Sequence, residues 1–256
     1  MIYLDNAATG GEKPAAVQNA VLAALQACAN PGRSGHSRSI AVAERVLACR
    51  RLLSDLFDGF GFERVVFTKN CTEALNLAIL GTLREGDHAV TTCLEHNSVL
   101  RPLEYLKKTR GVTYSVAPLV DGKLLPETIA SPVRPETKLC CVTSASNVTG
   151  ETPDLFAVRM RLPERVLFLV DGAQGAGHLP LKMRAAGIDF LALAGHKGLH
   201  AIQGAGALLF SERVSPDPVL FGGTGSESFN LDMPAFYPHP LESRTLSYPA
   251  ISSLFG

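Results

Sequence analysis

Hydrophobic residues recur along the chain at two spacings, which predict alternating helices and strands. Apolar positions three and four residues apart share one face of a helix, and they predict helices over residues 14–29, 39–57, 71–83 and 98–106. Short apolar runs bounded by polar turns predict strands over residues 65–68, 88–94, 112–116, 138–143, 166–170 and 189–194. Residues 1–9 read as an extended segment, and residues 30–36 as a loop.

Strand, polar loop and helix follow one another repeatedly. This order predicts an α/β fold with a doubly wound, mainly parallel sheet and flanking helices. In such sheets a ligand binds beyond the carboxyl ends of the strands. The polar residues expected at that edge are Thr72, His96, Asn147, Asp171, Gln174, His196 and Lys197. The sequence therefore predicts one site there.

Each of these residues also has an ordinary explanation when taken alone. Thr72 could cap the helix that begins near it. His96 and Asn147 could be hydrogen-bonded structural residues, and Lys197 could be a surface lysine. Their shared position at one sheet edge is what favours a functional site.

Composition and charge narrow the class of protein. The 256 residues are 46% hydrophobic and 19% charged, which suits a globular protein with one large domain or two small ones. The 24 basic and 24 acidic residues balance, so neither nucleic acid nor an anionic membrane is expected as the main partner. No apolar run reaches the roughly 20 residues that cross a bilayer, and the first residues do not resemble a leader. We expect a cytoplasmic protein.

The cysteines predict neither a metal site nor a disulfide framework. The six are Cys28, Cys49, Cys71, Cys93, Cys140 and Cys141. None forms a C-x-x-C pair, and none has the histidine spacing of a zinc site. We expect free thiols in a reducing compartment, each one a small buried residue.

The polar residues at the sheet edge match the needs of an aldehyde cofactor that carries a phosphate and a ring nitrogen. The amine of Lys197 can hold the aldehyde as a Schiff base. Asp171, after a five-residue apolar strand, can keep the ring nitrogen protonated. The helix that begins at Cys71 and Thr72 can bind the phosphate at its N-terminus.

The remaining needs concern the ring. His96 could stack on its face, and Asn147 and Gln174 could donate hydrogen bonds to its hydroxyl. The cofactor that requires this set of groups is pyridoxal 5'-phosphate.

Six motifs resemble those of class V aminotransferase-fold enzymes, and most closely those of the cysteine desulfurases. They are Tyr3-Leu-Asp-Asn-Ala-Ala-Thr9, Asn30-Pro-Gly-Arg-Ser-Gly-His36, Phe67-Thr-Lys-Asn-Cys-Thr-Glu-Ala-Leu-Asn76, Glu95-His-Asn97, Asp171-Gly-Ala-Gln174 and Gly195-His-Lys197. They occur in order over essentially the whole chain. Selenocysteine lyases and other class V lyases and transaminases share most of them, so the motifs are more specific for fold and cofactor than for reaction.

The resemblance implies the large domain of a pyridoxal-phosphate-dependent transferase, with the aminotransferase fold of type I. It implies Lys197 as the Schiff-base lysine and proton carrier, Asp171 on the pyridine nitrogen and His96 stacked on the ring. The remaining implied roles are as follows: Gln174 and Asn147 lie near the ring oxygen, Thr72 and His196 bind the phosphate, and Thr245 reaches the phosphate of the partner subunit. A homodimer with shared sites is therefore implied.

The chain departs from the family pattern at several positions. Ala194 replaces a serine or threonine near the phosphate, Ala201 and Ile202 replace a Gly-Pro pair, and Arg244 replaces a glycine beside Thr245. These changes bear on phosphate affinity and dimer geometry. Arg244 could clash where the backbone needs a positive φ, or it could add a phosphate contact.

Three segments are expected along the chain. Residues 1–12 form an N-terminal arm, residues 13–248 a large domain that binds the cofactor, and residues 249–256 the start of a truncated C-terminal domain. The last segment reads as a short helix begun at Pro249, with apolar residues and nothing to bury them. Related enzymes continue into a smaller domain, which carries the nucleophilic cysteine and the arginine that binds the substrate carboxylate.

The first functional hypothesis is a cysteine desulfurase, which moves sulfur from L-cysteine to an enzyme persulfide, releases L-alanine and supplies a sulfur-acceptor protein for iron–sulfur cluster assembly. We expect this activity to be absent or impaired on this chain alone. The alternatives are another class V lyase or transaminase, and a remnant that binds pyridoxal phosphate without catalysis. A nucleotide-binding Rossmann protein is disfavoured because no G-x-G-x-x-G motif follows a first strand.

Overall fold

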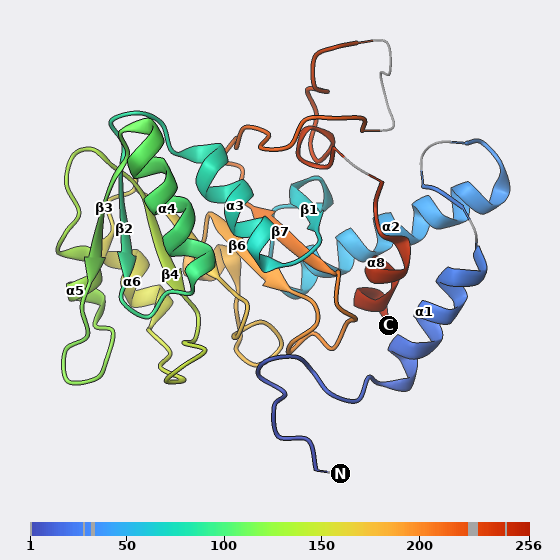
Figure 1. Cartoon of the computed structure of the whole chain (residues 1–256), viewed down its shortest axis with the longest axis horizontal. Coiled ribbons are helices and arrows are strands. Elements are labelled where there is room, and N and C mark those ends of the chain that lie inside the picture. Colours follow the sequence, from blue (N-terminus) through green and yellow to red (C-terminus); the bar gives the residue numbers. More distant parts are fainter. Residues whose placement is uncertain (1, 28, 32–33, 225–229, 244) are drawn as a thin grey trace.

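A seven-stranded sheet crosses the middle of the computed structural model, which describes residues 2–27, 29–31, 34–224, 230–243 and 245–256 (Figure 1). The strand order is β1-β7-β6-β5-β4-β2-β3. The strands are β1 (Val65–Thr68), β2 (His88–Thr92), β3 (Thr113–Ala117), β4 (Thr137–Thr143), β5 (Leu167–Asp171), β6 (Phe190–Ala194) and β7 (Gly206–Phe210).

The sheet is mainly parallel, as predicted, with one strand reversed. β2 to β6 pair in parallel, whereas β7 is antiparallel to both of its neighbours, β6 and β1. Thr143 lies opposite Asp171 in the register of β4 and β5. The carboxyl ends of β4, β5 and β6 therefore meet at one edge. β7 was not predicted, because its residues follow a glycine-spaced stretch that reads as a loop.

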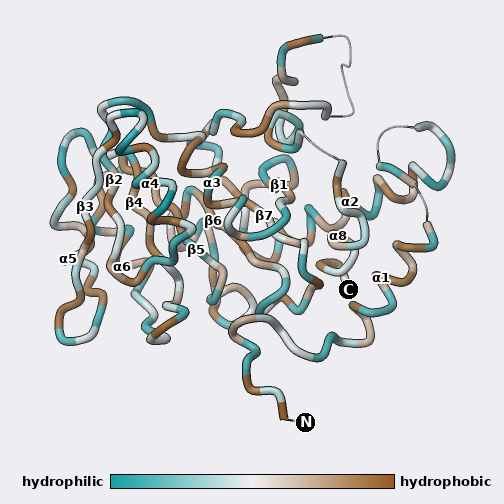
Figure 2. The backbone as a smooth tube through the Cα atoms, viewed as in Figure 1, coloured by the Kyte–Doolittle hydropathy of each residue, from teal (hydrophilic) through white to brown (hydrophobic). Residues whose placement is uncertain are grey.

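The long helices lie where the hydrophobic spacing predicts them. They are α1 (Ala15–Ala27), α2 (Ser37–Leu56), α3 (Cys71–Thr82) and α4 (Asn97–Arg110), joined by the shorter α5 (Pro126–Ala130), α6 (Leu155–Arg161), α7 (Met183–Ala186) and α8 (Tyr248–Phe255). α5, α6 and α7 were not predicted, because four to seven residues are too few for a helical period to stand out. Hydrophobic and hydrophilic residues alternate along α1 and α2 (Figure 2), as expected for helices with one buried side.

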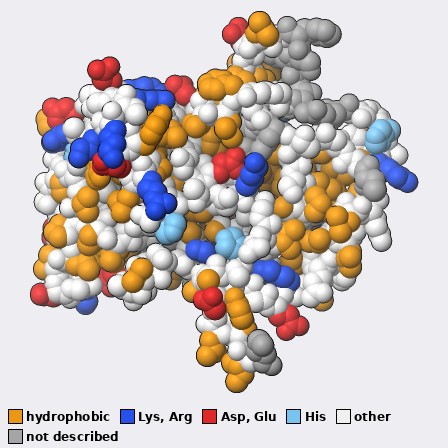
Figure 3. All heavy atoms as spheres, in the orientation of Figure 1, with side chains coloured by type: hydrophobic (Ala, Val, Ile, Leu, Met, Phe, Trp, Pro, Cys, Tyr) orange, Lys and Arg blue, Asp and Glu red, His pale blue; other side chains and the backbone are white. Residues whose placement is uncertain are grey.

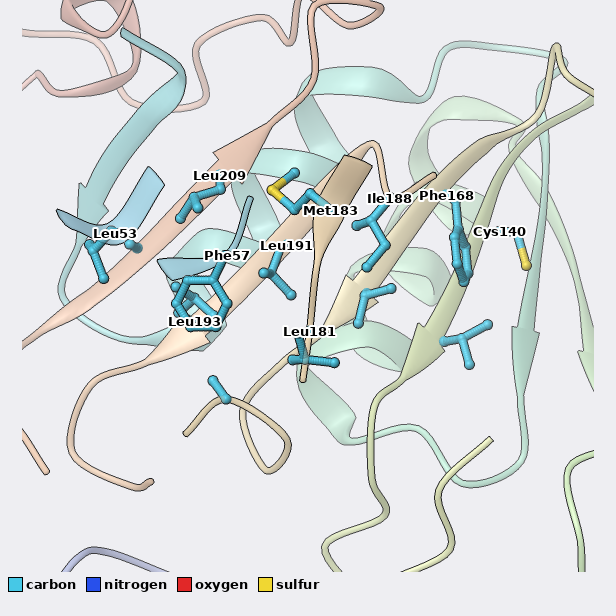
Figure 4. Packing of buried hydrophobic residues seen from close by; sticks show 14 of the residues in the cluster. Leu53, Phe57, Cys140, Phe168, Leu181, Met183, Ile188, Leu191, Leu193 and Leu209 are labelled. Atoms are coloured by element: carbon cyan, nitrogen blue, oxygen red, sulfur yellow. The ribbon is translucent and has the colours of Figure 1, made fainter. Parts of the chain in front are cut away.

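Two hydrophobic layers cover the two faces of the sheet. Leu167 and Leu169 pack into the layer under α3 and α4. Phe168 and Val170, between them in β5, pack into the opposite layer with α2, α6 and α7. Figure 4 shows this second layer, where Phe57, Leu191 and Leu209 come from a helix end and two strands. Buried strands with apolar side chains on both faces are typical of a parallel sheet between helices.

A buried ion pair covers the outer edge of β1. Arg50 in α2 lies 2.5 Å from the Glu242 carboxylate, and both side chains are almost fully buried. Glu242 Oε1 accepts the backbone N–H of Phe67 at 2.6 Å, and Arg50 donates to the carbonyl oxygen of Val65. The pair thus satisfies backbone groups of an edge strand, which would otherwise offer a template for pairing with another chain.

Helix α8 is packed against the rest of the chain. It contacts α1 and α2, and Ala250 and Ile251 are buried. The Oγ atom of Ser253 also accepts the backbone N–H of Ile202 at 3.1 Å. The expectation that this segment has nothing to bury its apolar residues was therefore wrong, because α1 and α2 supply that surface. The segment boundaries proposed from the sequence remain predictions.

The surface includes both polar and apolar regions. Hydrophobic side chains gather over the region of α1, α2 and α8 (Figure 3). None of the described helices combines the length and the apolar composition of a membrane span.

One cysteine differs from the expectation that each is buried. Cys93 is exposed because it directly follows the end of β2, where the chain leaves the sheet. Cys28 lies outside the described residues.

Candidate active site

A pocket of about 410 Å³ opens at the sheet edge where β4, β5 and β6 end. Histidine and basic side chains gather in the middle of this face, beside the N-terminal arm (Figure 3). The predicted residues that line the pocket are Cys71, Thr72, His96, Asn147, Asp171, Gln174, His196 and Lys197. The structure therefore brings together every predicted site residue except Thr245.

The N-terminus of α3 forms one wall. Asn70 caps this helix, because its side-chain oxygen accepts the backbone N–H of Glu73 at 2.9 Å. Thr72, which could have been the cap, instead places its hydroxyl 2.8 Å from that of Ser98 in α4. Asn70, Cys71 and Thr72 all line the pocket, so the positive end of the α3 dipole faces it. This wall is suited to an anion.

The ring of His96 is held in one orientation. His96 caps α4, and its Nδ1 atom accepts the backbone N–H of Ser98 at 3.1 Å. The Ser98 hydroxyl lies 2.8 Å from the same nitrogen. Because a backbone N–H can only donate, Nδ1 is the unprotonated nitrogen of the neutral ring. Ser98 therefore links the hydroxyl of Thr72 to a ring whose orientation is fixed.

Asp171 ends β5 and is buried, with 4% of its surface exposed. Its Oδ1 atom accepts the backbone N–H of Ala173 at 2.9 Å and the thiol of Cys71 at 3.3 Å. Burial raises the pKa of Asp171 above its usual value, although these two hydrogen bonds and the charge of Lys197 oppose the shift. A cationic group in the pocket would favour its ionised form.

Cys71 is not an activated thiol. Burial raises its pKa well above that of a free cysteine, and the neighbouring Asp171 carboxylate raises it further. Since the thiolate is the reactive form, this residue is a poor nucleophile. Its thiol donates a hydrogen bond to Asp171, and the predicted role of this residue in binding a phosphate remains a prediction.

Lys197 and His196 follow β6 and are half-buried. The Nδ1 atom of His196 lies 3.1 Å from the Thr9 hydroxyl, and its carbonyl oxygen accepts the N–H of Gly10 at 2.7 Å. Burial lowers the pKa of His196, and the charge of Lys197 lowers it further. His196 thus contributes a neutral ring that ties the Lys197 loop to the N-terminal arm.

The N-terminal arm forms part of the pocket, which the sequence did not indicate. Asp5, Ala7 and Ala8 line it. The side-chain amide of Gln174 donates to the carbonyl oxygen of Ala7 at 3.2 Å. Gln174 therefore holds the arm across the end of β5.

Other lining residues were also missed. Ser98 and Thr143 line the pocket, although neither was a candidate. The sequence signal for Ser98 was its place two residues after His96, within the first turn of a helix. Asn147, which was predicted, is exposed at the rim.

Thr245 lies away from this pocket. It lines a separate cavity of about 50 Å³ together with Thr68, Lys69 and Gly204. Its expected contact with a partner subunit remains a prediction. The neighbouring Arg244 lies outside the described residues.

Ala194, Ala201 and Ile202, which the resemblance singled out, lie in two places. Ala194 is buried and lines the pocket. Ala201 is fully buried in a small cluster with Ala205 and Ala250, against which Ile202 packs. Ala201 and Ile202 therefore pack the Lys197 loop against α8.

Curated proteins of similar sequence are named as cysteine desulfurases. A probable cysteine desulfurase of Pyrococcus abyssi is 31% identical over 231 residues, which cover 88% of this chain and 57% of that protein. A second, of Methanothermobacter thermautotrophicus, is 33% identical over 87% of this chain and 56% of that protein. The chain thus spans little more than half the length of these curated relatives.

A solved structure is similar over nearly the whole chain. The apo structure of a cysteine desulfurase from Thermococcus onnurineus is 30% identical, with a TM-score of 0.90 over 99% of this chain and 65% of that one. The sequence model of the family described as aminotransferase class-V matches residues 2–254. The chain therefore belongs to the class V aminotransferase family.

Proposed function

We propose that this chain carries the pyridoxal 5'-phosphate site of a cysteine desulfurase. The observation that carries the proposal is the meeting of Lys197, Asp171 and the N-terminus of α3 in one pocket. An amine, a buried carboxylate and an anion site are the groups that this cofactor needs from a protein. The family membership and the cysteine desulfurase relatives support the same cofactor and substrate.

The residues present fit the cofactor. The N–H groups at the start of α3 and the hydroxyl of Thr72 would hold the phosphate, with the neutral ring of His196 nearby. Asp171, whose pKa is raised by burial, would pair with the ring nitrogen. His96 would stack on the ring, since its orientation is already fixed by Ser98.

When bound, the cofactor would supply an electron sink for a negative charge at the substrate's alpha carbon. Lys197 would hold the cofactor and then move the proton at that carbon. Gln174 and Asn147 would donate hydrogen bonds to the ring oxygen. The arm around Ala7 and Ala8 would exclude water from one side of the pocket.

The overall reaction would convert L-cysteine to L-alanine. The carbon–sulfur bond of the substrate breaks, the sulfur goes to a protein thiolate as a persulfide, and the carbon that lost the sulfur gains a proton. Cys71 is unsuited to accept the sulfur, because burial raises the pKa of its thiol. We therefore assign Cys71 no part in accepting the sulfur.

Further features of the family extend the proposal. A homodimer would bring Thr245 to the partner's phosphate, and an acceptor protein would take the sulfur toward iron–sulfur clusters. The large domain would comprise residues 13–248, and the enzyme would act in the cytoplasm.

The experiment is a titration of the purified chain with pyridoxal phosphate, followed by visible absorption. We expect a protein-bound band in wild type and in Lys138→Ala, an exposed control lysine, but not in Lys197→Ala. Borohydride reduction followed by peptide mass spectrometry should place the cofactor on Lys197. Absence of binding in wild type would contradict the cofactor assignment.

A second assay addresses the reaction. Alanine formation from L-cysteine would be measured for the chain alone and for the chain supplemented with a thiol acceptor. Cofactor binding without any alanine formation would show that this chain binds the cofactor but does not complete the reaction by itself.

A further inference from the structure

Glu95 is a buried acid that is hydrogen-bonded to Thr143, a residue of the pocket lining, and it has no role in the function proposed above. It lies in the turn between β2 and α4, immediately before His96, and only 7% of its surface is exposed. It does not line the pocket. A buried carboxyl group is costly unless its oxygen atoms are hydrogen-bonded or it loses its charge.

The two oxygen atoms of Glu95 have different surroundings. Oε1 accepts the hydroxyl of Thr92 at 2.7 Å and the backbone N–H of Thr143 at 2.8 Å. Thr92 ends β2 and Thr143 ends β4, so this oxygen joins the ends of two neighbouring strands. Thr143 in turn lies opposite Asp171. Glu95 therefore fixes the His96 turn relative to the strand that pairs with β5.

Oε2 is buried and has no hydrogen-bond partner among the described residues. An ionised Glu95 would leave part of its negative charge on this atom, with no donor to balance it. A proton on Oε2 removes that charge and keeps both hydrogen bonds at Oε1, because a protonated carboxyl group still accepts through its other oxygen. The different surroundings of the two oxygen atoms thus favour the protonated, uncharged form of Glu95.

We propose that Glu95 is a positioning residue that works as a neutral carboxylic acid, fastening the turn that carries His96 to the end of β4 through Oε1 and carrying a proton on Oε2. The proposal rests on the cofactor site described above, because it assigns Glu95 a part in arranging that site. A neutral Glu95 leaves Asp171 as the carboxylate that balances a cationic ring nitrogen.

The surrounding titratable groups agree with this state. Those that interact electrostatically with Glu95 are Asp171 on β5 and the thiols of Cys140 and Cys141 on β4, all three of them buried. Burial raises the pKa of Glu95 to about 8, and the charge of Asp171 adds to this, against the opposing hydrogen bonds from Thr92 and Thr143. Among the described residues, no basic side chain contributes to this shift of the Glu95 pKa.

The first test uses the apo chain and needs no cofactor. The folded state would keep the Glu95 proton between pH 4.5 and about 8, whereas the unfolded chain loses it near 4.5. Unfolding would then release one proton, so the free energy of unfolding falls as pH rises through this window. Urea unfolding at a series of pH values should show that the free energy of unfolding falls more steeply with rising pH, or rises less steeply, in wild type than in Glu95→Gln, because other groups contribute equally to both.

The same comparison in an Asp171→Asn background separates the two acids. We expect the slope to differ between Asp171→Asn and the double variant Asp171→Asn/Glu95→Gln by about as much as it differs between wild type and Glu95→Gln. Equal slopes with and without Glu95→Gln would mean that Glu95 is ionised in the folded chain and would overturn the proposal.

The second test measures pyridoxal phosphate affinity by absorption. Glu95→Gln keeps an acceptor for Thr92 and Thr143 and should bind within about threefold of wild type, whereas Glu95→Leu should bind about tenfold or more weakly. Tight binding by Glu95→Leu, or an equal loss in both variants, would contradict the positioning role. If wild type binds no cofactor, the proposed function fails, while the unfolding test still reports on the state of Glu95.

Discussion

The thiol of Cys71 donates a hydrogen bond of 3.3 Å to Oδ1 of Asp171, so the first residue of α3 is fastened to the last residue of β5. Oδ1 also accepts the N–H of Ala173. Both bonds use the same oxygen, and together they fix the orientation of the carboxylate. A cysteine at this position thus couples the anion-binding helix to the acid of the proposed site.

Replacing Cys71 tests this coupling. Cys71→Ala removes one donor to Asp171 and should weaken pyridoxal phosphate binding about fivefold, equivalent to about 1 kcal/mol. Cys71→Ser keeps a donor and should bind within about twofold of wild type. Cys93→Ala, at an exposed thiol, is the matched control. Unchanged affinity in Cys71→Ala would show that the contact has no part in cofactor binding.

A close contact between two glycines should fix the Lys197 loop. Gly177 has a φ of +86°, and a Cβ atom there would overlap the carbonyl group of Gly198. Gly177→Ala should therefore push Gly198 and Lys197 out of place and abolish cofactor binding. Gly86 has a similar φ of +83° and open space around it.

Gly86→Ala is thus the control for backbone strain alone, which costs about 1 kcal/mol. Urea unfolding would compare the two variants, and absorption would report cofactor binding. Equal loss of stability in both, with binding retained in Gly177→Ala, would show that the loop adapts to the added methyl group.

Sequence patterns predicted the long helices and six of the seven strands because most of these elements bury apolar residues at a regular spacing or in a short run. β7 (Gly206–Phe210) is also a buried apolar run, but it follows a glycine-spaced stretch that reads as a loop. In the structure it pairs with β6 and β1. α8 was predicted as a helix, but its burial depends on α1 and α2, which are distant in sequence.

The predicted site residues share one property, which is that they follow strands whose carboxyl ends a parallel sheet brings to one edge. The order of the strands in the sheet is therefore enough to bring Asp171 and Lys197 to the same pocket. The residues that were missed depend on contacts between distant segments. Ser98 matters because it joins Thr72 to His96, and Asp5 because the arm reaches β5 and β6. No local pattern encodes those contacts.

Removing one member of the buried Arg50–Glu242 pair should strongly destabilise the chain. Glu242→Leu leaves the Arg50 charge buried without its partner and should destabilise the chain by about 3–5 kcal/mol. The double variant Arg50→Met/Glu242→Leu should lose less than the sum of the two single variants, because it leaves no unpaired charge.

The control is Glu127→Gln, which breaks an ion pair with Arg161 in which both side chains are largely exposed. This variant should lower the free energy of unfolding by less than about 1 kcal/mol. Urea unfolding of the single and double variants gives the coupling energy between Arg50 and Glu242. Additive losses would mean that each residue acts independently at the edge of β1.

His88 should contribute a loss of stability in mild acid. Its ring is fully buried, with Nδ1 at 2.8 Å from the Thr137 hydroxyl and Nε2 at 3.0 Å from that of Ser115. Burial lowers the pKa of His88 below 6.5, and the charge of Arg134 lowers it further. The unfolded chain therefore binds a proton near pH 6.5 that the folded chain does not bind, so this residue's contribution to the free energy of unfolding should decrease as pH falls below that value.

Measured by urea unfolding, His88→Gln should be less stable than wild type at neutral pH but should lose less stability on acidification. The control is His178→Gln, at an exposed histidine. A slope in His88→Gln as steep as in wild type would assign the acid sensitivity to other groups.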